Sequence, residues 1–173
     1  MPRLLQLFVD ILLLRAGPQD VPASPALLAI AVMASALTSW LLALEVFAGP
    51  HAFARVAIEL ALMAGLVLGL LALHGRSARF LQSFTALCGA GAMLALLAWP
   101  LFGIALGRPR GDELGALAML MLWLVYAWNI VVIGHILRHA LDSGLARGVV
   151  LALVFALLVA GTGEWLLPAP EAR

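Results

Sequence analysis

The stretch FLQSFTALCGAGAMLALLAWPLFGIAL, residues 80–106, decides the fold, because no charged side chain interrupts it. An α-helix rises about 1.5 Å per residue, so about 20 apolar residues cross the ~30 Å hydrocarbon core of a bilayer. The stretch therefore predicts a transmembrane helix with length to spare. Pro100, in its last third, predicts a kink.

The composition of the whole chain points the same way. The 173 residues are 65% hydrophobic and 11% charged, whereas soluble domains are about 45–50% apolar and about 25% charged. A soluble fold of this length could not hide so much apolar surface in one core. The net charge of +1 offers no strong field for nucleic acid. The composition predicts an integral membrane protein without a nucleic-acid partner.

Four more apolar segments flank the first one, at about 26–48, 52–74, 114–137 and 145–167. Short turns rich in glycine, proline and charged residues separate them, and a short tail follows at 168–173. Turns of this length make neighbouring helices antiparallel and leave no room for a folded domain outside the membrane. The predicted fold is all-α, an integral membrane bundle of five transmembrane helices over residues 26–167.

Residues 1–16 form a different kind of segment. Arg3, Gln6 and Asp10 recur at helical spacing and leave a broad apolar face, which predicts an amphipathic helix lying along the membrane surface. The alternative is a secretory signal peptide cleaved near PASPA, although Asp10 interrupts its apolar run. A proline-rich linker over 17–25 follows, and Ser24 before Pro25 is typical of a helix start.

Arginine placement predicts the orientation. With the N-terminus in the cytoplasm, the inner segments hold Arg3, Arg15, Arg76, Arg79, Arg138 and Arg147. The outer segments hold Arg55, Arg108, Arg110 and Arg173. Basic residues accumulate on the cytoplasmic side. All ten basic residues are arginine, which is typical of a GC-rich genome. The arginine distribution predicts a cytoplasmic N-terminus and a C-terminus on the opposite side of the membrane.

Ionisable groups inside the predicted spans are the first functional candidates, because lipid makes them costly. Glu45 and Arg55 flank the turn between the first two spans, so they are expected to be neighbours, and Glu59 lies one helical turn from Arg55. The cluster is either a structural ion-pair network or a proton or ligand site. Asn129 lies near the middle of the fourth span and either lines a cavity or hydrogen-bonds between helices.

The segment HILRHALD, residues 135–142, places two histidines on one helix face at i and i+4. A metal site would need a third ligand, with Asp142 the nearest candidate, and we predict no bound metal or cofactor. Headgroup binding is the second interpretation, because basic groups at the cytoplasmic interface attract lipid phosphates. The third is plain interfacial anchoring. The residues of the headgroup interpretation are His135, Arg138, His139 and Arg147.

A stripe of small residues, Ala61, Gly65 and Gly69, recurs every four residues in the second span. Such stripes let another helix approach closely. We expect an intramolecular packing seam here, faced by Gly89, Ala90 and Gly91, with a homodimer face as the alternative. Cys88, the only cysteine, is expected to be a small packing residue.

The segments LLLRAGPQDVPASPALL (12–28) and WNIVVIGHILRHAL (128–141) resemble features of small proteobacterial inner-membrane proteins. The layout is similar to the Yip-domain superfamily, whose members have a cytoplasmic N-terminal segment and five closely linked spans. The DLxGP-type motif of the eukaryotic members is not found. The resemblance implies the five-span fold and a place in the bacterial inner membrane, which would make the C-terminus periplasmic. No residue role is transferred.

Three functions compete at this point. The sequence contains no GxSxG, HExxH or GxGxxG motif, which favours a non-enzymatic scaffold or assembly factor. Its partners would be the bilayer, a second copy of the chain or another inner-membrane protein. The alternative is a small transporter or channel subunit with Glu59 as an intramembrane coupling carboxylate. An enzyme acting on lipids through His135 and His139 is the third.

Overall fold

The computed structural model describes residues 2–47, 49–109 and 111–166, and every regular element among them is a helix. Five of these helices are long and apolar enough to cross a membrane, which confirms the predicted all-α architecture. They are α2 (Pro25–Ala43), α3 (Gly49–Leu73), α4 (Phe80–Leu106), α5 (Glu113–Leu141) and α6 (Leu145–Leu166). The shorter elements are α1 (Pro2–Leu12) and the 3-10 turns η1 (Pro18–Asp20) and η2 (Ser77–Arg79).

Local chemistry explains where these helices begin and end. Ser24 caps α2 by accepting a hydrogen bond from the Leu27 N–H at 3.3 Å, and Asp112 caps α5 through the Gly115 N–H at 2.9 Å. Helix α2 ends at Ala43, earlier than the expected 48, and residues 44–47 form turns before α3 begins. Helix α5 runs to Leu141, one turn beyond the expected 137. Helix α4 continues through Pro100.

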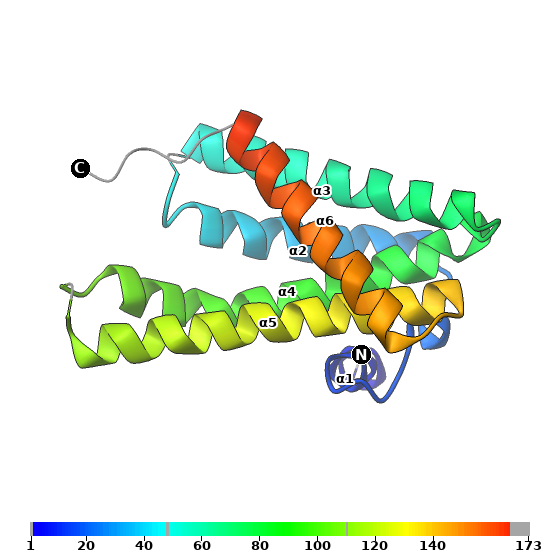
Figure 1. Cartoon of the computed structure of the whole chain (residues 1–173), viewed down its shortest axis with the longest axis horizontal. Coiled ribbons are helices and arrows are strands. Elements are labelled where there is room, and N and C mark those ends of the chain that lie inside the picture. The colour runs from blue at the N-terminus through cyan, green and yellow to red at the C-terminus, as the bar shows by residue number, and fades with distance from the viewer. Residues whose placement is uncertain (1, 48, 110, 167–173) are drawn as a thin grey trace.

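Helices α2, α3, α4 and α5 run along one axis, α6 crosses them obliquely, and α1 is set across the bundle (Figure 1). Helix α2 packs on α4, α4 on α5, and α5 on α6, whereas α3 packs mainly on α2 and α6. We call residues 13–24, which join α1 to α2, the strap. The strap, the α3–α4 turn and the α5–α6 turn lie at one end of the bundle, the strap end, and the α2–α3 and α4–α5 turns lie at the far end.

The buried core is concentrated toward the strap end. In α4 every residue from 83 to 90 is buried, and in α5 the buried run covers 134–137. The outer surfaces carry large apolar side chains instead, among them Met33 at 71%, Phe53 at 71% and Leu157 at 73% exposure. Soluble monomers rarely expose such continuous apolar surface, whereas lipid-facing helices do.

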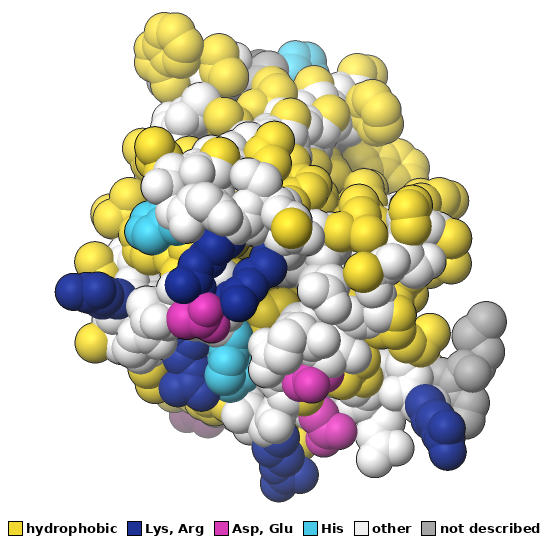
Figure 2. Space-filling model, turned by 90° about the vertical axis from the view of Figure 1, so that its right-hand side faces the viewer, with side chains coloured by type: hydrophobic (Ala, Val, Ile, Leu, Met, Phe, Trp, Pro, Cys, Tyr) yellow, Lys and Arg dark blue, Asp and Glu magenta, His cyan; other side chains and the backbone are white. Residues whose placement is uncertain are grey.

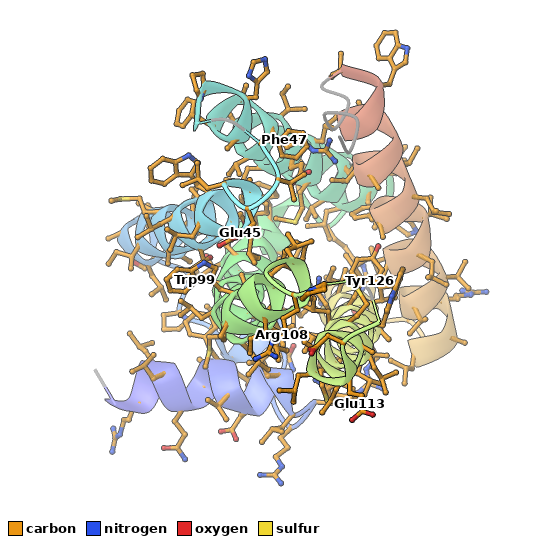
Figure 3. The ribbon with its side chains drawn as sticks, turned by 90° about the vertical axis from the view of Figure 1, so that its left-hand side faces the viewer. Glu45, Phe47, Trp99, Arg108, Glu113 and Tyr126 are labelled. Atoms are coloured by element: carbon orange, nitrogen blue, oxygen red, sulfur yellow. The ribbon has the colours of Figure 1, made fainter. Side chains whose placement is uncertain are left out.

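Helix α1 is seated on the side of α4 and α5. Its Phe8 and Ile11 side chains enter the core, and Arg3 and Gln6 are exposed. The Phe8 ring fits against Gly89 so closely that a Cβ at position 89 would overlap it. Gly89 therefore faces α1, which corrects the expectation that residues 89–91 pack against the small-residue stripe of α3. Figure 3 shows α1 running transverse to the bundle.

Helices α5 and α6 cross at close range. A Cβ on Gly134 would lie 2.8 Å from the Val149 Cα, and a Cβ on Gly148 would overlap the Gly134 carbonyl oxygen. Small residues allow this approach, as they do in membrane helix pairs generally. The packing seam within the chain is therefore this glycine pair.

Candidate functional site

Three side chains of α4 and α5 hold the end of α1 and the strap by hydrogen bonds to backbone carbonyls. Trp128 Nε1 donates to the Leu12 carbonyl at 3.0 Å. Gln82 Nε2 donates to the Val21 carbonyl at 2.7 Å and to the Gln19 carbonyl at 3.3 Å. The third is His135, whose Nε2 lies 2.8 Å from the carbonyl oxygen of Ala16. These bonds satisfy polar groups that would otherwise be costly against an apolar bundle.

This arrangement corrects the predicted role of His135. The side chain is only 1% exposed, and because a carbonyl can only accept, the Nε2 atom carries the proton in this bond. It therefore anchors the strap and is closed to a lipid headgroup. The His139 ring lies beside it, with ring centroids 4.7 Å apart in an edge-on arrangement. Among the described residues no three potential metal ligands are grouped together.

The strap end is tied together by two arginines of the α3–α4 turn. Arg76 Nη1 donates to Asp142 Oδ2 at 2.5 Å, and Arg79 Nη1 donates to Asp142 Oδ1 at 2.9 Å. Arg79 also donates to the carbonyls of His139 and Ala140, each at 3.1 Å. A cation at these carbonyls caps the negative end of the α5 dipole.

Asp142 is well placed for this contact because it ends α5 in the left-handed conformation, with φ 49°. Aspartate tolerates that conformation better than most side chains. The hydrogen bond from Arg79, together with the charges of Arg76 and Arg79, holds the pKa of the Asp142 carboxyl below its usual value. The carboxylate therefore stays ionised in the folded protein at neutral pH.

A pocket of about 310 Å³ opens beside this cluster. Its walls come from the strap, the first turn of α4 and the end of α5. Figure 2 shows basic, acidic and histidine side chains gathered on this end of the molecule, with apolar side chains around them. The lining residues are Pro18, Gln19, Arg79, Gln82, Ser83, His139, Ala140 and Asp142.

Of the four residues in the predicted headgroup set, only His139 lines this pocket. Arg138 is half-buried in the last turn of α5, and Arg147 is exposed at the start of α6. Arg79, Gln82 and Ser83 line the pocket but are not among the site residues predicted from the sequence. The available signal was the topology, because five antiparallel helices place the GRSAR turn and the HALDSG turn at the same end of the bundle.

The predicted intramembrane cluster lies toward the far end (Figure 3). Arg55 Nε lies 2.6 Å from Glu59 Oε1, as their spacing predicts, and the Arg55 guanidinium stands 5.5 Å from the centre of the Phe47 ring. Glu45 accepts a hydrogen bond from Trp99 Nε1 at 3.3 Å. Asn129 is half-buried in α5, well along the helix from this cluster.

The small-residue stripe of α3 faces outward. Ala61, Gly65 and Gly69 are exposed, and a Cβ built on either glycine meets no atom within 4 Å. The expected intramolecular seam is therefore wrong. An open apolar groove of about 430 Å³ runs over this face and is lined by Ile58, Ala61, Leu62, Gly65 and Leu66.

Comparison with known proteins gives no relative for this arrangement: no family model, no curated protein and no solved structure matches the chain. The likeness to Yip-domain proteins stays a prediction from the layout of the helices.

Proposed function

We propose that this protein is a non-enzymatic multi-pass membrane protein that acts as a scaffold or assembly factor through helix–helix contacts. Its first partner, in this proposal, is a second copy of the chain. The observation that carries the proposal is the outward-facing stripe of Ala61, Gly65 and Gly69 on α3.

In a membrane, a stripe of small residues provides a surface for helix association. Apolar side chains gain little by leaving lipid for another apolar surface, so helices associate in membranes where small residues let their backbones come close. The groove on α3 provides such a surface without a charged residue in its lining. Each helix that docks there gains van der Waals contacts that lipid chains make less well.

The shape of the groove favours a second copy as the occupant. Copies inserted in the same orientation bring α3 to α3 as parallel helices related by a two-fold axis. Each stripe then meets itself, and the larger Ile58, Leu62 and Leu66 side chains flank the contact on both sides. A self-complementary surface of this kind is the simplest route to a closed dimer.

The proposed placement in the membrane follows the arginine distribution. The strap end lies on the cytoplasmic side of a bacterial inner membrane, and α1 lies along that surface. The exposure of Arg3 and Gln6 on α1 supports this placement.

The test is the mass of the assembled protein in lipid nanodiscs. We expect a dimer, and we expect Gly65→Leu to weaken dimerisation by at least ~10-fold, because a bulky side chain separates the backbones. Gly103→Leu on α4 is the matched control, since Gly103 is also exposed with no atom within 4 Å of a built Cβ. A monomeric protein that captures a different membrane protein through α3 would replace the second copy as partner. Equal effects of both substitutions would contradict the proposal.

A second candidate, a transporter or channel subunit, draws on the Arg55–Glu59 pair within α3. A charge pair inside an apolar helix is unusual enough to suggest a function. Solute flux into liposomes decides between the two candidates. Flux that Glu59→Gln abolishes supports the transporter, whereas no flux with the wild-type protein supports the scaffold.

A further inference from the structure

The pocket at the strap end lies apart from the α3 groove, and some of its lining side chains do not anchor the strap. It lies between the first turn of α4 and the last turn of α5, with Pro18 and Gln19 of the strap as its third wall. Its volume of about 310 Å³ is at the lower end of small-ligand pockets, which span ~300–1,000 Å³. It therefore suits a small polar group.

The charges around the pocket favour an anion. Two guanidinium groups, those of Arg76 and Arg79, share the single carboxylate of Asp142, so the cluster retains a net positive charge. Both Asp142 oxygens are engaged by these arginines, which limits their repulsion of a second anion. Arg79 makes its three hydrogen bonds, to the His139 and Ala140 carbonyls and to Asp142, through Nη1, and it lines the pocket.

The start of α4 adds a second contribution. This helix begins at Phe80, and its N-cap residue, Arg79, makes no side-chain capping bond. The N-terminus of a long helix carries a partial positive charge and is a common site for phosphate and other anions. Gln82 and Ser83, both lining the pocket, lie in this first turn.

Ser83 gives the independent indication of a ligand. Its side chain is 1% exposed, and its Oγ atom has no hydrogen-bond partner among the described residues. A buried hydroxyl without a partner is costly, and such groups are uncommon in native proteins. A ligand oxygen at the pocket floor would accept this hydrogen bond.

We propose that this pocket binds a phosphate group, carried by a lipid headgroup or by a free anion. Arg79 and the first turn of α4 supply the positive charge, Ser83 donates a hydrogen bond from the floor, and His139 closes the side toward α5. A phosphate fits this set because its oxygens can accept several hydrogen bonds at once and pair with a guanidinium. The inference is independent of the α3 contact.

The first experiment is titration of the full-length protein, in uncharged detergent micelles, with inorganic phosphate. Sodium chloride at matched ionic strength controls for general charge screening. We expect saturable binding that Ser83→Ala weakens by ~3–10-fold and Arg79→Gln by at least ~10-fold. Arg147→Gln removes an equal charge from an exposed position at the same end, and we expect it to change binding by less than ~2-fold.

Ser83→Ala leaves the Arg79–Asp142 tie intact, so its result stands even if Arg79→Gln fails to fold. The source of the phosphate is decided by native mass spectrometry from nanodiscs of phosphatidylcholine with phosphatidylglycerol. Retention of phosphatidylglycerol that Ser83→Ala lowers identifies a headgroup site, and phosphate binding without such retention identifies a free anion. Absence of both, or equal losses in Ser83→Ala and Arg147→Gln, overturns the proposal.

Discussion

The Nε2 atom of His135 lies 2.8 Å from the carbonyl oxygen of Ala16, 119 residues earlier in the chain. This bond joins the last turns of α5 to the strap just where the chain leaves α1. It lies deep in the core, with His135 only 1% exposed. The neighbouring anchors, Trp128 and Gln82, also donate to backbone carbonyls. The position of the strap therefore depends more on these donor side chains of α4 and α5 than on the side chains of the strap itself.

Replacing His135 by phenylalanine should therefore loosen the strap. The substitution keeps an aromatic ring but leaves the Ala16 carbonyl without its donor, and we expect a loss of ~1–3 kcal/mol in unfolding free energy. Trypsin should also cleave faster after Arg15, which is exposed in the strap. Trp128→Phe, at a more exposed anchor, should cost ~0.5–1.5 kcal/mol. An unchanged cleavage rate in His135→Phe would show that the bond does not hold the strap.

The packing of α1 should be disturbed by substitution of Gly89 in α4 but not by substitution of Gly91. A methyl group at position 89 would overlap the Phe8 ring, whereas a Cβ at Gly91 meets no atom within 4 Å. We expect Gly89→Ala to destabilise the protein by ~1–3 kcal/mol and Gly91→Ala to have little effect. The combined loss in a protein carrying both Phe8→Ala and Gly89→Ala should be smaller than the sum of the two single losses, because removing the ring leaves room for the new methyl group. Additive losses in a double-mutant cycle would argue against this contact.

The crossing of α5 and α6 should behave in the same way. Gly148→Ala places a methyl group against the Gly134 carbonyl. Because a backbone group cannot move aside as a side chain can, we expect the free energy of unfolding to fall by ~1–3 kcal/mol. Gly161→Ala, in the same helix but with open space around it, should be neutral or slightly stabilising. Thermal unfolding in detergent measures both. Equal melting temperatures would mean that the helices cross elsewhere.

The Asp142 tie should show a defined pH dependence. Its arginine partners lower the pKa of the folded-state carboxyl, so the tie contributes its full stability above the unfolded value of about 3.9. That contribution is lost as the pH falls through the lowered folded pKa. The melting temperature of wild type minus that of Asp142→Asn should be constant from about pH 5 to about pH 7 and shrink below about pH 4. A difference that persists in strong acid would mean that charge is not what Asp142 contributes.

Much of the fold could be predicted from the sequence because lipid imposes a simple rule. Each crossing needs a long apolar run, and the turns between these runs carry recognisable breakers. The end of α5 was harder, because residues 138–141 look interfacial yet continue the helix until Asp142 adopts the left-handed conformation. The direction in which the α3 stripe faces also could not be predicted from the sequence. Apolar residues lie on every face of these helices, so hydrophobic periodicity does not show which face packs on protein and which contacts lipid.

The pocket at the strap end could be predicted from the sequence only in part. Arg76 and Arg79 stand 66 and 63 residues before Asp142, and the pairing of helices, not any local motif, brings them together. The alternation of short turns could have placed them at one end. The role of His135 could not have been foreseen, since it depends on how α1 folds back onto α4 and α5.

The measurement that tests the central claim most directly is disulfide crosslinking through α3 in native membranes. Cys88 is fully buried, so a cysteine introduced at the exposed Ala61 should report alone. We predict that Ala61→Cys forms a covalent dimer of this chain under mild oxidation, because the two-fold contact brings both copies of position 61 together. Leu157→Cys, at a 73% exposed position on α6, should stay monomeric. Crosslinking at position 157 equal to that at 61, or none at 61, would contradict the account.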